Sequence, residues 1–284
     1  MRLTAALVAC AALMLGLAPG ARAAHYYLAL GDSLAAGFQA PPVKPHAGYV
    51  DGLYARALRR QRDLRLANVA CLGATSATLM SGDLCSATAG PQLQRAVRFL
   101  RRHRGKVSLV TIDIGGNDIG AACGTGLSVT VQCARSALVT TGTNVSKIAH
   151  DLRAAAGRQT PIVAMNYYDP GLAFWLQPSS RAVVPETLSI VDTLNRTLAH
   201  AYRSADVAMA DVATAFASHD LRHTTALAGH GRVPVAVANI CRYTGACLTP
   251  QNNHGTALGY RVITRAFLSA LAKVGEHLRG RIDA

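Results

Sequence analysis

The chain has 284 residues, of which 50% are hydrophobic and 15% are charged. This length and apolar content allow a substantial buried core, which excludes a disordered or fibrous polypeptide. The 29 Lys and Arg residues outnumber the 15 Asp and Glu residues, giving a formal net charge of +14. The excess reflects a shortage of acids, and the densest basic clusters, Arg59–Arg62 and Arg101–Arg104, fall where helices are predicted to end. We therefore expect no nucleic-acid partner.

The first residues have the layout of a secretory signal peptide. Arg2 precedes an apolar run from Leu3 to Leu17, and small residues follow at Ala21, Ala23 and Ala24. The apolar run is too short for a comfortable membrane span. We predict a signal peptide over residues 1–23 and a secreted, extracellular chain over residues 24–284.

Short apolar segments alternate with longer helical patterns along the mature chain. Strands are predicted at Tyr26–Leu30, Leu64–Ala70, Val107–Ile114, Pro161–Asn166 and Asp206–Ala210. Each strand is too uniformly apolar for one of its faces to be exposed to solvent, which indicates a parallel sheet covered by helices on both sides. Helices are predicted at Tyr49–Arg60, Pro91–His103, Thr143–Ala156, Pro185–Tyr202 and about Thr256–Leu278. The order predicts one doubly wound α/β domain, a three-layer α/β/α sandwich around five parallel strands.

Two connections are predicted to be unusually long, at about Gly115–Thr141 and Asp211–His254, and both carry cysteines.

Six cysteines remain after the signal peptide. Six allow fifteen connectivities, and their spacing favours pairing of neighbours: Cys71 with Cys85, Cys123 with Cys133, and Cys241 with Cys247. A zinc site is the alternative, but there is no Cys-x-x-Cys pair. His219 and His223 have the spacing of one helical face but lack a Glu for hydrolytic metal chemistry, so we expect no metal and no cofactor.

Candidate chemistry follows the predicted strands, because ligands of open α/β sheets bind at the carboxyl ends of the strands. Gly31-Asp32-Ser33-Leu34 follows the first strand. Ser33 would lie at the mouth of the following helix, where N–H groups and the helix dipole stabilise a developing anion. A serine is a nucleophile only when a base takes its proton, and helix capping is the alternative role.

Three further segments supply polar or backbone groups at the same edge. Gly73 follows the second strand and could offer its N–H to an oxyanion. Asn117 follows two glycines after the third strand and could donate a further hydrogen bond, although a Gly-Asn turn is also possible. His254 lies in the loop entering the last helix.

Together, these four blocks in this order resemble the SGNH/GDSL hydrolase family, and in particular secreted actinobacterial lipases and esterases. The resemblance implies a flavodoxin-like fold. It also implies that Ser33 is the nucleophile, that His254 is the general base, and that Gly73 and Asn117 join the Ser33 N–H in an oxyanion hole. The Gly-x-Ser-x-Gly elbow of α/β-hydrolases is absent, which favours this arrangement over that one.

The sequence departs from the family pattern at the acid that usually precedes the histidine. Asn252 and Gln251 occupy those positions. In a related triad, an amide in place of the acid lowers kcat about 10⁴-fold, mainly through the wrong histidine tautomer. We predict a Ser-His dyad in which an amide oxygen or a backbone carbonyl orients His254; the alternatives are a weakly active protein or an acid from elsewhere, such as Asp169 or Asp211.

The leading hypothesis is a secreted esterase or lipase that cleaves small-molecule or lipid carboxylic esters as a monomer. Tyr168 and Trp175, after the fourth strand, are candidates for the substrate pocket, and core packing is the alternative. The same four residues would also serve a carbohydrate deacetylase. A catalytically weak binder of anionic membrane or cell-wall components is the alternative from another class, favoured by the basic charge.

Overall fold

The computed structural model describes residues 24–82, 84–85 and 88–282. The predicted signal peptide therefore lies outside the described residues. A five-stranded parallel sheet forms the centre of the molecule, in the order β2-β1-β3-β4-β5. The strands are β1 (His25–Gly31), β2 (Leu64–Asn68), β3 (Val107–Asp113), β4 (Ile162–Met165) and β5 (Ala208–Ala210).

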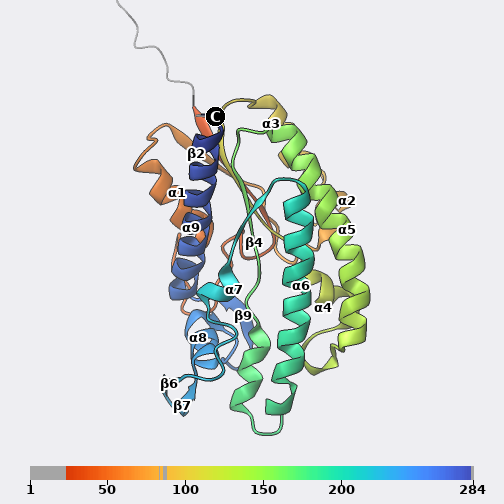
Figure 1. Ribbon diagram of the computed structural model, residues 1–284, viewed down its shortest axis with the longest axis vertical. Coiled ribbons are helices and arrows are strands. Elements are labelled where there is room, and N and C mark those ends of the chain that lie inside the picture. Colours follow the sequence, from red (N-terminus) through yellow and green to blue (C-terminus); the bar gives the residue numbers. More distant parts are fainter. Residues whose placement is uncertain (1–23, 83, 86–87, 283–284) are drawn as a thin grey trace, which may run out of the picture.

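Helices cover both faces of this sheet, as predicted (Figure 1). On one face α1 (Tyr49–Leu58) packs against α9 (Ala257–Ile282). On the other face α5 (Val131–Ala156) packs against α3 (Gln92–Arg102) and α6 (Val184–Ser204). The predicted three-layer α/β sandwich is confirmed. The basic clusters end helices as expected, since α1 is followed by Arg59 and α3 ends in Arg101 and Arg102.

Strand β2 departs from the prediction of uniformly buried strands. It is an edge strand in which Leu64 is buried, Arg65 and Asn68 are exposed, and the two residues between them are half-buried. It also ends at Asn68 rather than Ala70. An edge strand borders solvent, so some of its side chains remain exposed to water.

Both long connections contain more regular structure than the sequence predicts. In the first, α4 (Gly116–Cys123) is followed by a 3-10 turn (Gly126–Ser128) and by α5, which begins at Val131 instead of Thr143. The Thr130 side chain caps α5 by accepting from the Cys133 N–H at 3.2 Å. Helix α5 packs along α6, and this tertiary contact stabilises residues of weak helix propensity.

The second connection holds α7 (Val212–Ala215), the antiparallel hairpin β6 (Thr224–Leu227) and β7 (Gly231–Pro234), and α8 (Val235–Tyr243). A second short hairpin pairs β8 (Thr244–Gly245) with β9 (Asn252–Gly255). The remaining elements are α2 (Ser76–Ser81) and the 3-10 turns η2 (Pro170–Leu176) and η3 (Arg181–Val183). His219 and His223 do not share a helix; they bond separately to Asp192 and Asp220.

Three disulfides join neighbouring cysteines, which confirms the predicted pairing. Cys71 bonds to Cys85, Cys123 to Cys133 and Cys241 to Cys247. Among the helices built from described residues, none is long and apolar enough to cross a membrane.

Candidate active site

Ser33 lies in a tight turn that leaves the carboxyl end of β1. Gly31 begins this turn with a φ of 138°, and a Cβ there would lie 2.2 Å from the Asp113 carbonyl oxygen, so only glycine fits. The expectation that Ser33 lies at the mouth of the following helix is wrong, although that helix itself begins at Tyr49 as predicted. Residues 32–37 form hydrogen-bonded turns and α1 begins only at Tyr49, because Gly37 adopts a positive φ and several prolines follow.

His254 on β9 faces Ser33. Its Nε2 lies 2.8 Å from Ser33 Oγ, and its Nδ1 lies 2.8 Å from Oδ1 of Asn252. The same Oδ1 accepts the backbone N–H of His254 at 3.0 Å. This second bond requires the oxygen of the amide, not its nitrogen, to face the imidazole. Nδ1 therefore carries the proton, and Nε2 is free to accept the proton of the Ser33 hydroxyl.

The surroundings of His254 fix its position and its protonation. The Phe38 ring packs edge-on against the imidazole at 4.6 Å between centroids, and the Tyr168 hydroxyl donates to the carbonyl of Asn253 at 2.6 Å. Burial lowers the pKa of His254 from its ordinary value of 6.5, and the nearby Asp32 charge opposes this shift. The imidazole of His254 is therefore mostly neutral at neutral pH.

Three hydrogen-bond donors, on Ser33, Gly73 and Asn117, follow the carboxyl ends of the adjacent strands β1, β2 and β3. Gly73 follows β2 with a φ of 74°, a backbone conformation that favours glycine. Within the described residues, the N–H groups of Ser33 and Gly73 bond to no protein acceptor. Asn117 donates from its side-chain amide to the carbonyl of Ala74 at 3.0 Å, which leaves its second amide hydrogen for a ligand.

A cluster of hydrogen bonds links the loops that carry Gly73 and Asn117. The carboxylate of Asp118 accepts from the Ser76 N–H at 2.9 Å and from the Ser76 hydroxyl. Thr141 on α5 donates to Asp118 at 3.3 Å, and Asn144 donates to Ser76 at 3.0 Å. We call Ser76, Asp118, Thr141 and Asn144 the clasp. It ties α2 and α4 to α5 and thereby sets the spacing of the two loops.

The comparisons with known proteins agree with this geometry. The model of the GDSL-like lipase/acylhydrolase family matches residues 29–262. The chain belongs to this family. It is accordingly a carboxylic ester hydrolase. A search among curated proteins found no match.

Solved structures of GDSL-type and other lipases share the fold. A lipase from a goat rumen metagenome has a TM-score of 0.58 and 17% identity, over 87% of this chain and 97% of that chain. An extracellular lipase from Streptomyces rimosus has a TM-score of 0.55 and 22% identity, over 87% of this chain and 100% of that chain. At sequence identities this low, the similarity to these two lipases shows a shared fold and nothing further.

The remaining residues singled out in this GDSL-family chain lie around the site or apart from it. Gln251 is exposed, and among the hydrogen bonds of the described residues it is Asn252 that bonds to the imidazole. Asp169 caps η2 and Asp211 caps α7, each through its side chain. Burial raises the pKa of Asp169 to about 6, and its bonds go to Gly171 and Thr187. Neither acid bonds to His254.

Tyr168 and Trp175 make packing contacts. The Tyr168 ring stacks on Phe216 at 4.5 Å between centroids, and its hydroxyl supports the His254 strand. Trp175 packs against the small apolar cluster of α8 and lies under the Arg181 guanidinium at 3.9 Å. Contact of these two residues with substrate stays a prediction.

Sequence reasoning missed two acids and one aromatic residue of the site. Asp113 ends β3 and supports the Ser33 turn, Asp118 belongs to the clasp, and Phe38 packs on His254. Asp118 directly follows the Gly115-Gly116-Asn117 segment and Asp113 precedes it by two residues, and that proximity was an available signal. Phe38 gave none, because its contact with His254 joins residues 216 positions apart.

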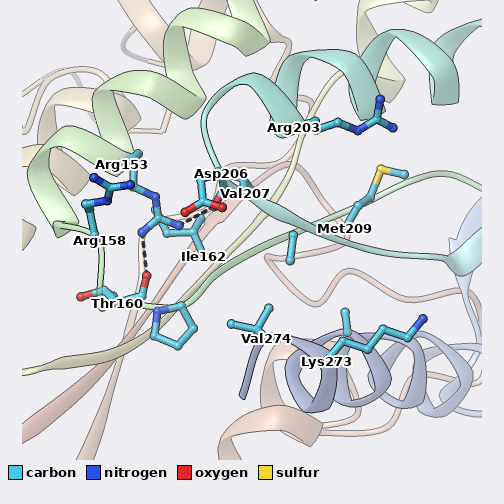
Figure 2. A pocket seen from close by; sticks show the side chains of 13 residues that line it. Arg153, Arg158, Thr160, Ile162, Arg203, Asp206, Val207, Met209, Lys273 and Val274 are labelled. Atoms are coloured by element: carbon cyan, nitrogen blue, oxygen red, sulfur yellow. Dashed lines mark hydrogen bonds between the residues drawn. The ribbon is translucent and has the colours of Figure 1, made fainter. Parts of the chain in front are cut away.

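A separate cavity of about 340 Å³ lies at the opposite end of the sheet, where β4 and β5 begin (Figure 2). Arg153 in its wall donates to the carbonyls of Gly157, Thr160, Ala205 and Asp206. Its guanidinium therefore serves to hold the end of α5 against neighbouring loops. None of the four predicted catalytic residues lines this cavity.

Proposed function

We propose that Ser33 is the nucleophile of this ester hydrolase and that His254 is its general base. The observation that carries the proposal is the 2.8 Å contact between Ser33 Oγ and His254 Nε2. His254 takes the hydroxyl proton as Oγ attacks the ester carbonyl, and later protonates the departing alcohol. Water then attacks the acyl-serine by the same route, with His254 again acting as base, and releases the carboxylic acid.

The carbonyl oxygen becomes negatively charged in each tetrahedral intermediate. The N–H groups of Ser33 and Gly73 and the side-chain amide of Asn117 would donate to it, since none of these donors is fully used within the described residues. Preorganised donors of this kind contribute about 10²–10³ in rate each. The clasp supports this role by fixing the loops that carry two of them.

The proposed site works as a dyad oriented by an amide. In the serine protease triad, an amide in place of the acid costs about 10⁴ in kcat mainly because it stabilises the wrong tautomer. Here the second bond of Asn252 Oδ1, to the His254 backbone N–H, favours the productive tautomer. What the amide does not provide is a negative charge beside the imidazole.

Exposed apolar side chains near the site favour a lipid-like ester over a carbohydrate ester. Phe38 is 44% exposed beside His254, Leu72 is 51% exposed next to Gly73, and Leu248 is 44% exposed on the β8–β9 connection. Apolar surface left in water at a catalytic site is typical of contact with an apolar ligand. We further propose that the protein acts outside the cell, which the predicted signal peptide and three disulfides support.

Hydrolysis of nitrophenyl esters from acetyl to palmitoyl tests the proposal. The wild type should hydrolyse the longer chains, and Ser33→Ala and His254→Ala should each lose at least about 10³-fold in kcat/KM. Wild-type activity no higher than that of Ser33→Ala would contradict the catalytic assignment. A sharp preference for acetyl esters would instead contradict the lipid-like substrate and favour a deacetylase.

A further inference from the structure

Exposed Arg and Lys side chains gather where the strands of the central sheet begin. All strands of this parallel sheet begin at the same edge, so the segments that precede β2, β3, β4 and β5 lie at one end of the molecule. Together with Lys273 on α9, which lines the cavity at this edge, these exposed cations form what we call the basic end: Arg59, Arg60, Arg62, Arg101, Arg102, Arg104, Lys106, Arg158, Arg203 and Lys273. The basic end lies at the top of Figure 1, whereas β9, the strand that carries His254, lies in the lower half.

Helix dipoles explain only part of this charge. Arg101 and Arg102 lie in the last turn of α3 and Arg203 lies in the last turn of α6, where a cation is favoured. That effect falls off within the last turn of a helix. The basic end continues beyond the helices into loops, which carry Arg62, Arg104, Lys106 and Arg158. The helices therefore do not account for these loop cations.

The cations of the basic end lack partners among the described residues. The ion pairs found there involve other cations, namely His46, Lys147, His219 and His223. Between described residues, no side chain of the basic end takes part in a hydrogen bond either. The acids nearby are Asp63 and Asp206 in the segments before the strands and Glu276 on α9. Like charges without partners repel one another, and a bound anion would relieve that repulsion.

The two edges of the sheet carry charge of opposite sign. Several acids lie at the edge opposite the basic end, at or just after the ends of the strands: Asp32, Asp113, Asp118, Asp169 and Asp211. The excess positive charge at the basic end acts on His103, because burial and then the charges of Arg102 and Lys106 lower the pKa of this imidazole. Surfaces that serve only solubility usually intersperse both signs. A separated patch of one sign favours a partner of the other sign.

The cavity at this end lies between cations (Figure 2). Its volume of about 340 Å³ is at the lower end of the range for small-ligand pockets. Arg153, Arg158, Arg203 and Lys273 outnumber the acid of its lining, Asp206. Figure 2 shows Arg203 and Lys273 on one side of the cavity and Arg153 and Arg158 on the other. The cations thus surround the cavity instead of converging on one point, which suits a chain of anionic groups better than a single small anion.

The surface of the basic end is poorly suited to a lipid bilayer. The exposed large apolar side chains of the described residues all lie outside it; they are Phe38, Val43, Leu72, Leu84, Leu127, Val139, Leu248 and Leu258. Proteins that lie on a bilayer insert apolar side chains next to their cations. A flat bilayer also cannot follow cations into a cavity, whereas a flexible chain can.

The aromatic residues at the basic end are not arranged to stack on nucleic-acid bases. Such stacking needs free ring faces. Tyr26 and Phe99 lie at this end, but they pack edge-to-face at 5.2 Å between centroids, and His103 packs against both rings. Arginine, which prevails in the basic end, binds phosphate through two parallel N–H bonds. The surface therefore favours phosphate groups without bases.

We infer that the basic end binds a linear, base-free polymer with repeating phosphate groups. The phosphates pair with the loop cations, and one segment of the polymer lies in the cavity between α5, α6 and α9. Ser33 and His254 lie at the opposite edge of the sheet, so the bound enzyme keeps its active site facing away from the polymer. This binding goes beyond ester hydrolysis and does not depend on the proposed catalytic roles.

Isothermal titration calorimetry of the purified protein with long-chain inorganic polyphosphate tests the inference. The wild type should bind, and raising NaCl from about 50 to 200 mM should weaken the binding at least about tenfold, because each phosphate contact releases counterions. A wild type that does not bind polyphosphate at the lower salt concentration would overturn the inference.

Two double variants test where the polymer binds. Arg104→Glu with Lys106→Glu changes the loop before β3, and Arg158→Glu with Arg203→Glu changes the cavity. Each should weaken polyphosphate binding at least about tenfold. These side chains are exposed and form no hydrogen bond between described residues, so the fold should be unchanged, which circular dichroism checks.

The matched control is Arg135→Glu with Arg222→Glu, which changes the net charge by the same amount. Arg135 lies near the start of α5 and Arg222 precedes β6, so both are exposed and away from the basic end. This control should weaken polyphosphate binding no more than about threefold, because salt screens distant charges. Equal weakening by the control and by the two test variants would overturn the inference, since binding would then depend on net charge alone.

Other anions identify the partner. Polyglutamate, duplex DNA and phosphatidylglycerol vesicles should each bind more weakly than polyphosphate at the same concentration of anionic groups. Equal or tighter binding of any of them would overturn the assignment to a base-free phosphate polymer. Hydrolysis of a soluble nitrophenyl ester should continue at the same rate with polyphosphate bound, and inhibition would instead place the polymer at the active site. If the Ser33→Ala control contradicts the proposed function, the calorimetric result is unaffected.

Discussion

Asn252 decides how far this active site departs from a triad. Its Oδ1 fixes the tautomer of His254 through two bonds, one to Nδ1 and one to the backbone N–H. A side chain at this position can have two separable functions: it can orient the imidazole, and it can place a negative charge beside it. The Asn252 amide orients the imidazole but carries no charge.

Substitution of Asn252 should separate these functions. Asn252→Asp should raise the maximal kcat by no more than about tenfold and move the acid limb of the kcat/KM profile to higher pH, because the amide already selects the tautomer and the variant adds only a negative charge beside the imidazole. Asn252→Leu should lower kcat by about 10²-fold or more, because no side-chain acceptor then selects the tautomer. The pH dependence of kcat/KM for both variants is the measurement. A gain near 10⁴ in Asn252→Asp would show that the wild-type site is a degraded triad.

At the scale of elements, we expect the clasp to control the geometry of the proposed oxyanion hole. Asp118 on α4 holds the start of α2, and both contact α5. Asp118→Ala should lower kcat about 10- to 100-fold with little change in KM, because the donors act mainly in the transition state. Asp151→Ala is the matched control, since the sole side-chain partner of that carboxylate among the described residues is the exposed Lys147. Equal kcat values in the two variants would contradict the role of the clasp.

The elements also show what could be predicted from sequence. Buried parallel strands have an unmistakable apolar pattern, so all five were predicted within a few residues. The first half of α5 was missed because Val139-Thr140-Thr141-Gly142-Thr143 has weak helix propensity. In the structure Gly142 allows close contact with α6, where a Cβ would lie 2.8 Å from Thr197. Packing between distant segments overrides local propensity there, and it leaves no local signal.

The same limit applies to the site. Ser33, Gly73, Asn117 and His254 were predictable because each follows a strand or enters a helix at one edge of the sheet. The contacts of Phe38, Tyr168 and Asp113 with these residues depend on how distant loops fold together. Local sequence carries little information about such contacts.

For the whole molecule, the disulfides lie beside three of the four segments that carry the proposed catalytic residues. Cys71 precedes Gly73 by two residues, Cys123 follows Asn117 by six, and Cys247 precedes His254 by seven. The sheet itself contains no cysteine. Loss of a bridge should therefore disturb the loops before it disturbs the sheet.

Replacement of Cys71 and Cys85 by serine should lower kcat more than the same replacement of Cys123 and Cys133. Removing a short bridge costs about 2–4 kcal/mol of stability in either case, but Cys71 lies closer to its oxyanion donor. Hydrolysis rates and far-UV circular dichroism at the same temperature separate the two effects. Parallel loss of activity and of helical signal in both variants would show that the bridges only stabilise the fold.

The central claim is that Ser33 is a nucleophile activated by His254. Reaction with a fluorophosphonate tests it most directly, because the reagent forms an Oγ–P bond with loss of fluoride only at an activated serine. Mass spectrometry should find one adduct, on the peptide containing Ser33, with labelling absent in Ser33→Ala and slowed at least about 100-fold in His254→Ala. A folded wild type that forms no adduct, or a Ser33→Ala variant labelled at the wild-type rate, would contradict the account.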